Sequence, residues 1–333
     1  MKTRYLNLSL YRLIATFLVL QFHIIFILFI KDVGMNLILS KFLQGLTAMS
    51  GFLMARKTIT SVKDFYISRS KKILVPLLMV TIFILLWNIL YMLITKNYDF
   101  RATFIGYRTS SHSLLIEMGN FYYVLYILGC YLITPILEKK NWLSFVFIGL
   151  VFVLECASSL ITNPLFIASS YIVGYYIGRF SFEKYVSGKL DIKRVIFWLI
   201  LVGSSLFWSL YVMKNYGWRE NIFYKIGINL LYSTFGVSSL FFFLSVLKIL
   251  NREREYTFFR ITDELTYFIF LFNQAFMCGA MDVSKYVVFY EQKVALVYTF
   301  VIVFSLLLYV IYKLLYPKLE MSVLKLVSKK SIQ

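Results

Sequence analysis

Long apolar runs, separated by short polar and charged segments, make up most of this chain. Each run is about 20 residues long, the length of an α-helix that crosses the hydrocarbon core of a membrane. The runs predict ten spans, approximately at 10–30, 36–55, 73–95, 120–137, 142–161, 164–180, 195–213, 226–249, 264–281 and 294–316. We therefore expect an all-α fold, a polytopic transmembrane helix bundle, in which residues 1–333 form a single integral membrane domain.

The composition and the distribution of charge agree with a membrane protein. Hydrophobic residues make up 60% of the chain, whereas a soluble domain is nearer half apolar. The net charge of +19 could suggest nucleic acid, but 25 of the 35 lysines and arginines lie on the cytoplasmic side if the N-terminus is inside. This bias predicts an N-in/C-in topology, and contact with anionic lipid accounts for much of the charge. We therefore expect the lipid bilayer, and no nucleic acid, as a partner.

A histidine and an arginine interrupt the first apolar run. Arg12 lies eleven residues before His23, which puts both on the same face of a helix, with His23 about 16 Å farther along the axis. Arg12 then lies near one membrane surface and His23 near the middle, where ionisable side chains usually face a bundle interior or a watery cavity. The pair indicates a site for an extended anionic ligand. The alternative is a histidine that bonds across a helix interface and an arginine that only sets topology.

The second run and the segment after it carry further candidates. Ser50 and Gly51 lie within the second run, where small residues also serve simply to let another helix approach closely. The following cytoplasmic segment has one acid, Asp64, and a cluster of basic residues, Arg56, Lys57, Lys63, Arg69, Lys71 and Lys72. Such a cluster suits phosphate groups, which bind several cationic donors, although it also suits a topology anchor.

Several of these segments together resemble one protein family. The segments are an Arg-x10-His pattern at Arg12 and His23, Ser-Gly-Phe-Leu at 50–53, basic residues leading to Pro76, an aromatic segment at 122–135 similar to "WFL…YLLTP", and a segment at 265–273 similar to "SYxIYLxH". In this order they resemble the membrane-bound acyltransferase-3 family, from the first span to the ninth. Each motif is degenerate, and their order and spacing carry the resemblance.

The resemblance implies a reaction and a donor site. Proteins of this family move acyl groups, usually acetyl from cytoplasmic acetyl-CoA, onto hydroxyls of cell-surface or secreted glycans. By position, His23 matches the catalytic histidine, and the CoA-binding residues are Arg12, Arg69, Lys72 and Ser50. Lys72 stands where a second arginine is common, which keeps the charge but weakens bidentate phosphate binding.

The chain departs from the family pattern at two positions. Asn273 replaces the usual histidine of the ninth-span motif, and Asn120 stands where the fourth-span motif often begins with histidine. These two departures argue against a mechanism that needs a second membrane histidine. His112 falls in the long outer loop between the third and fourth spans, where a solvated side chain is the simplest interpretation.

Glu155, Asn273 and Tyr122 are weaker candidates for the side of the site that receives the acceptor. Glu155 lies in the outer half of the fifth span among apolar residues, and a buried acid in a membrane is a functional hypothesis by default. A structural hydrogen bond from Glu155 to Asn or Thr on another span is an equal alternative.

We therefore predict a membrane O-acyltransferase that modifies a surface polysaccharide, a teichoic acid or a lipid-linked sugar, in a cell membrane of bacterial type. His23 would act as a general base or as a nucleophile, with no metal. The three cysteines, Cys130, Cys156 and Cys278, have no metal-ligand spacing. A polysaccharide exporter or flippase is the main alternative. Homo-oligomers or glycan-assembly proteins are possible partners.

Overall fold

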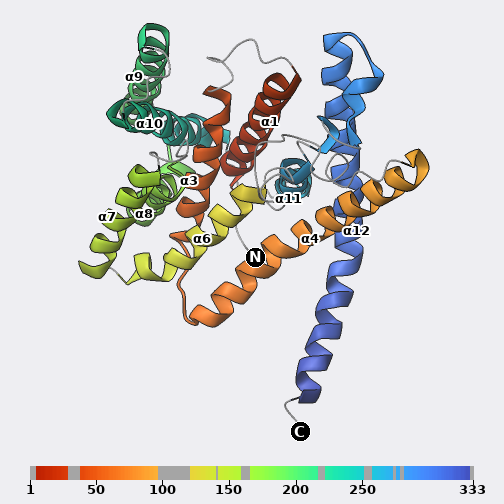
Figure 1. Ribbon diagram of the computed structural model, residues 1–333. Helices are drawn as coiled ribbons and strands as arrows, with labels where there is room; N and C mark the ends of the chain where they lie inside the picture. Colours follow the sequence, from red (N-terminus) through yellow and green to blue (C-terminus); the bar gives the residue numbers. More distant parts are fainter. Residues whose placement is uncertain are drawn as a thin grey trace. The chain divides into compact units, whose positions relative to one another are not determined.

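The computed structural model describes residues 5–28, 38–96, 121–139, 142–158, 166–216, 222–250, 257–272, 275–277 and 281–330 (Figure 1). Within these ranges the regular structure is helical. In the described part of the chain, ten α-helices follow the ten apolar runs in order: α1 (Leu6–Leu28), α3 (Phe42–Met54), α4 (Val62–Thr95), α6 (Phe121–Glu138), α7 (Trp142–Ser158), α8 (Ile167–Val186), α9 (Ile192–Tyr216), α10 (Ile222–Leu247), α11 (Thr257–Phe272) and α12 (Tyr290–Lys330). The described residues also include the short 3₁₀ turns η2 (Lys248–Leu250), η3 (Ala275–Met277) and η5 (Val283–Tyr286).

The all-helical, membrane-type fold is confirmed. Among the described residues, five helical stretches are long and apolar enough to cross a membrane: Leu6–Ile25, Val62–Thr95, Ile192–Val212, Tyr224–Leu250 and Glu291–Pro317. Shorter apolar helices cover Ile38–Met54, Tyr123–Glu138 and Ser144–Ala157. Many large apolar side chains on these helices are exposed, as expected for surfaces that face lipid. The count of ten spans and the N-in/C-in orientation stay predictions.

The basic segment before the third run is helical, although the apolar pattern places the start of that helix near residue 73. The Ser61 hydroxyl accepts a hydrogen bond from the Asp64 backbone N–H at 3.3 Å, which caps a helix that already begins at Val62. Arg69 and Lys72 therefore lie three residues apart on one side of α4. An apolar pattern finds the part of a helix that is in lipid and misses a polar extension.

The helices form two compact units that are interleaved along the chain. Unit 1 comprises residues 1–69 and 122–263, and unit 2 comprises residues 70–121 and 264–333. The boundaries fall inside α4 and α11, so each of these helices contributes to both units. Arg69 and Asp263 are the last residues of unit 1 on α4 and α11, respectively.

Close packing of α3 against α8 forms the centre of unit 1. A side chain at Gly51 would collide with the backbone of Tyr171, and one at Gly174 would collide with the backbone of Ala48. The two helix backbones therefore touch, which only residues without a Cβ permit at these positions. Next to this backbone contact, the Phe52 ring of α3 stacks on the Phe182 ring of α8, with the ring centroids 4.6 Å apart. The small residues of the second run thus serve helix packing.

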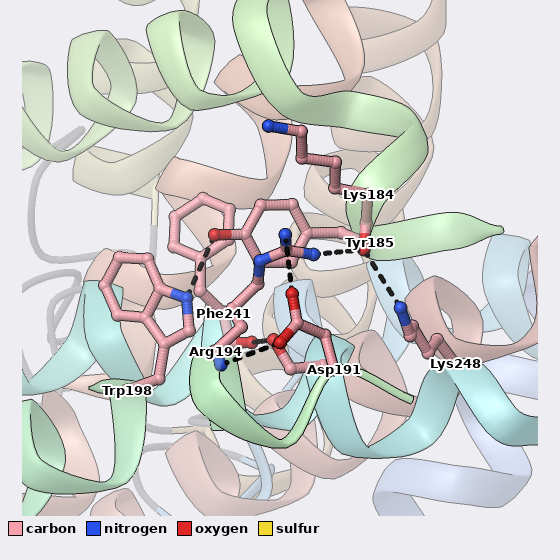
Figure 2. Close-up of polar contacts among 8 residues, drawn as sticks. Lys184, Tyr185, Asp191, Arg194, Trp198, Phe241 and Lys248 are labelled. Carbon is pink, nitrogen blue, oxygen red and sulfur yellow. Dashed lines mark hydrogen bonds and ion pairs between the residues drawn. The ribbon is translucent and has the colours of Figure 1, made fainter. Parts of the chain in front are cut away.

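A polar cluster holds together the end of α8, the start of α9 and the end of α10 (Figure 2). The Lys184 carbonyl oxygen accepts hydrogen bonds from Arg194 Nη1 at 2.7 Å and from Lys248 Nζ at 3.3 Å. Arg194 also pairs with Asp191 at 3.0 Å. Carbonyls in the last turn of a helix have no partner within the helix, so these cations satisfy the end of α8 and fix its neighbours.

Unit 2 has an aromatic core of its own. The Phe83 ring of α4 lies 5.8 Å from Phe272 of α11 and 5.4 Å from Phe304 of α12. A polar contact lies beside this core, where Glu264 accepts a hydrogen bond from the Tyr309 hydroxyl at 3.2 Å and forms an ion pair with Lys313. These contacts join α11 to α12 within the unit.

Candidate functional site

The relative direction of α1 and α3 defines the two ends of the candidate site in unit 1. Tyr5 directly precedes α1 and Arg56 follows α3, and Arg56 Nη1 donates a hydrogen bond to the Tyr5 hydroxyl at 2.9 Å. The two packed helices are therefore antiparallel, and the end of α1 and the start of α3 lie at the other end of the pair (Figure 1). Arg12 belongs to the first end, and His23 belongs to the second.

Three of the four predicted donor-binding residues gather around Tyr131 of α6. The Arg69 guanidinium carbon lies 5.7 Å from the centroid of the Tyr131 ring. The Tyr131 hydroxyl shares a side-chain hydrogen bond with Ser50 and interacts electrostatically with both Arg69 and Arg12. These ring, hydrogen-bond and electrostatic interactions involve side chains from four helices, α1, α3, α4 and α6, which we call the arginine cluster (Arg12, Ser50, Arg69 and Tyr131).

Tyr131 is held in place from the side of α8. Its ring lies 6.1 Å from the ring of Tyr171, and the Tyr171 hydroxyl is 2.7 Å from the hydroxyl of Thr134, one turn farther along α6. Tyr171 is completely buried. The aromatic side of the arginine cluster is therefore built into the helix packing.

The charge of the arginine cluster is unbalanced toward positive. Arg12 forms an ion pair with the Asp263 carboxylate, and its Nη1 also lies 3.5 Å from the Asp263 carbonyl oxygen. Arg69 has a buried Nε without a hydrogen-bond partner among the described residues. A buried donor without an acceptor costs free energy, and phosphate oxygens are suitable acceptors for guanidinium groups. The residues of the cluster therefore fit a phosphate-bearing donor such as acyl-CoA.

Lys72 and His23 lie farther along their helices than Arg69 and Arg12, respectively. Lys72 is exposed on α4, one helical turn beyond Arg69. His23 is 6% exposed and lies on the same continuous helix as Arg12, so the helical spacing puts it about 16 Å farther along α1. His23 is thus a buried imidazole in the half of the helix pair away from Arg12.

Asp263 and Tyr131 are site residues that the sequence did not identify. Asp263 directly precedes the ninth apolar run, where an acid reads as part of a polar loop. In the structure it lies inside α11 and faces Arg12. The one signal for Asp263 in the sequence is that it is an acidic residue at the edge of a predicted span in a strongly basic chain.

Glu155 has a structural role in the fold. Its two carboxylate oxygens accept hydrogen bonds from the backbone N–H groups of Ala168 at 2.8 Å and Ser169 at 3.0 Å, and the Ser169 hydroxyl also donates to it. The carboxylate thus caps the first turn of α8. The residue that begins this turn, Phe166, has a left-handed backbone (φ 44°, ψ 41°). Contact of Glu155 with an acceptor stays a prediction.

We expect Glu155→Gln to lower the Tm of the protein. An amide keeps one acceptor oxygen but turns an NH₂ group toward the N–H groups of α8, and the loss should amount to about 1–3 kcal/mol. Glu291→Gln, an exposed acid at the start of α12, is the control and should leave the Tm unchanged. An unchanged Tm with impaired acceptor kinetics for Glu155→Gln would instead assign this residue to the acceptor site.

The remaining candidates fall where the structure gives no side-chain contacts. Asn273, His112 and Cys278 lie outside the described residues. Tyr122 belongs to α6, and its side chain lies outside the described part of the chain. Their assignments therefore stay predictions.

Comparison with known families decides the identity of the chain. Residues 5–314 match the model of one family, described as an acyltransferase domain (Acyl_transf_3). The chain belongs to the acyltransferase-3 family. The match begins just before α1 and ends within α12, so the acyltransferase-3 domain includes helices of both units. No curated protein and no solved structure gives a significant match.

Membership of the acyltransferase-3 family confirms the resemblance seen in the motifs. It indicates a multi-pass membrane protein with acyltransferase activity. The arginine cluster of this acyltransferase-3 protein combines the first-span, second-span and third-span motifs in one place.

Proposed function

We propose that this protein transfers an acyl group, preferably acetyl, from cytoplasmic acyl-CoA to a hydroxyl of a surface polysaccharide, a teichoic acid or a lipid-linked sugar. The observation that carries the proposal is the arginine cluster, in which the buried Nε of Arg69, next to Tyr131, has no hydrogen-bond partner in the described part of the chain. The family membership supports acyl transfer, and the cluster supports a donor with phosphate groups.

The arginine cluster is the proposed site for the phosphates of CoA. Arg12 and Arg69 would supply guanidinium donors, and Lys72 would add a cation one turn along α4. When bound, acyl-CoA supplies an activated thioester. Ser50 and Tyr131 share a hydrogen bond beside the arginines, and they would fix the polar side of the passage.

His23 is the proposed catalytic residue. An imidazole can accept the proton of an acceptor hydroxyl, which becomes the attacking group, or it can take the acyl group transiently at a ring nitrogen and pass it on. Its burial near the far end of α1 keeps water away from either step. A label that stays on His23 after a rapid quench would indicate the second route.

The function is tested with purified protein in lipid vesicles, labelled acetyl-CoA and extracted cell-surface glycan. Transfer of label to the glycan, with an equal release of free CoA, is the expected result. Movement of a lipid-linked sugar across the vesicle membrane without thioester cleavage would contradict the proposal and indicate an exporter.

We expect Asp263→Asn to strengthen donor binding. Asp263 holds the Arg12 guanidinium, so a phosphate has to compete with this carboxylate, and an uncharged amide removes most of the competition. The apparent KM for acetyl-CoA should fall by about threefold or more. Asp191→Asn, which breaks a similar Asp–Arg pair at the start of α9, is the matched control. A raised KM for Asp263→Asn would show that the carboxylate instead positions Arg12 for the donor.

A further inference from the structure

A buried lysine lies at the end of unit 1 away from the arginine cluster. Lys41 directly precedes α3 and is 4% exposed. Its Nζ lies 4.7 Å from the centroid of the Tyr232 ring of α10. Among the described residues this ring is the partner of the ammonium group, which forms no ion pair with them.

The position of Lys41 puts it in the same half of the bundle as His23. Lys41 is at the start of α3 and His23 is in the last turns of the antiparallel α1. Tyr232 lies in the first half of α10, whereas Leu244, near the end of α10, contacts Asn7 at the start of α1. Two independent contacts therefore place Lys41 opposite the arginine cluster.

The surroundings of Lys41 favour a bound anion. An ammonium group that leaves water without a counter-ion costs much free energy, and an aromatic ring offsets only part of that cost. A group with negative charge that approaches this lysine would therefore be bound strongly.

We propose that Lys41 binds an anionic group of the acceptor, a phosphate or a carboxylate, and so restricts the enzyme to negatively charged glycans or glycan phosphates. This inference rests on the proposed function for its biological meaning, because only acyl transfer defines an acceptor. The binding itself does not depend on acyl transfer. Lys41 would act as a specificity residue, and His23 would remain the catalytic residue.

The test measures binding of small acceptor analogues to the full-length protein in nanodiscs of phosphatidylcholine. N-acetylglucosamine 1-phosphate and glucuronic acid are the anionic probes, and N-acetylglucosamine and glucose are the neutral controls. Calorimetry on the wild type should show saturable binding of at least one anionic probe, with its neutral control at least 10-fold weaker. Lys41→Met should weaken the anionic probe by at least 10-fold, and Lys41→Arg should retain most of its affinity. Equal affinity in the wild type and Lys41→Met, or no binding of either anionic probe, would overturn the proposal.

Two further variants locate the binding and check the fold. Arg12→Ala should bind the anionic probe as the wild type does, and loss of binding in that variant alone would place the anion in the arginine cluster and overturn the proposal.

Lys248 is a buried lysine whose Nζ has a carbonyl partner, so Lys248→Met should lower the Tm and leave probe binding unchanged. Lys41→Met should raise the Tm of the ligand-free protein, because it removes a buried charge. A lower Tm for Lys41→Met would show that the protein itself pairs this ammonium group, against the proposal.

The lipid composition of the nanodiscs distinguishes an anion of the acceptor from a lipid headgroup at Lys41. If phosphatidylglycerol in the nanodiscs abolishes probe binding to the wild type but not to Lys41→Met, the anion at Lys41 is a lipid headgroup, and the acceptor proposal is wrong. Release of CoA from acetyl-CoA, measured separately, tests the proposed function. A protein that binds the anionic probe through Lys41 without any thioester cleavage would retain this site and lose the proposed function.

Discussion

Replacing His23 with alanine is expected to reduce acyl transfer by at least 100-fold while the protein still inserts in the membrane. His23 is the histidine of α1, histidine is the side chain that most often serves as a general base, and general base catalysis contributes about 10²–10⁴ in rate. A methyl group in its place leaves only a small cavity beside α1, because His23 is a single buried side chain. The measurement is the rate of label transfer from acetyl-CoA to glycan by purified protein in vesicles.

The control for His23→Ala is donor binding by the same variant. The arginine cluster lies about 16 Å from His23 along α1, so the affinity for acetyl-CoA should stay within about twofold of the wild type. A variant that keeps near wild-type turnover would remove His23 from the mechanism. A variant that loses both turnover and donor binding would instead point to a structural role for the histidine.

Arg12→Ala and Arg69→Ala are expected to raise the apparent KM for acetyl-CoA by about 10-fold or more each. Each change removes charge-assisted hydrogen bonds to phosphate, worth about 1.5–3 kcal/mol. Acceptor KM should change much less, because the proposed reaction with the acceptor takes place at His23, about 16 Å from Arg12 along α1. Initial rates over a range of acetyl-CoA concentrations at fixed acceptor concentration give the answer.

The matched control is Arg56→Ala. Arg56 follows α3 at the same end of unit 1, but its guanidinium stacks on Phe182 at 4.5 Å and pairs with Glu183 at 3.7 Å. Its loss should leave the donor KM unchanged. Arg69→Lys should give an intermediate KM, because lysine keeps the charge without the planar fork. If Arg12→Ala and Arg69→Ala behave as Arg56→Ala does, the basic residues serve topology and not donor binding.

The apolar runs predict the order of the helices because lipid and helix interiors both select apolar side chains over a fixed length. The spacing of Arg12 and His23 predicts that both lie on one side of a single helix, because the helical period determines which positions share a side. The structure agrees, since α1 is continuous over both residues. The same reasoning gives no distances between helices. The contact of Ser50 with Tyr131 therefore comes from the structure alone.

Contacts between side chains of different helices could not be predicted from the sequence. Asp263 is 251 residues from Arg12 along the chain, and nothing in the local pattern of either residue specifies the other. Glu155 shows the same limit, because a buried acid predicts a hydrogen-bonding partner but does not identify the first turn of α8. Hydropathy reports how each segment is solvated, whereas pairing depends on tertiary packing.

The backbone contact between α3 and α8 has a consequence for the affinity of the donor site. At Gly51 and Gly174 the two main chains are in direct contact, so no side-chain rotamer has to be fixed there when a ligand binds. Ser50 precedes that contact by one residue, and Tyr171, which supports Tyr131, belongs to it. One wall of the arginine cluster is thus ordered when the protein folds. Donor binding therefore costs conformational entropy mainly in the long arginine side chains and in the donor itself. Substitutions at Gly51 or Gly174 that loosen the contact between α3 and α8 should weaken donor binding, although they remove no group that contacts the donor.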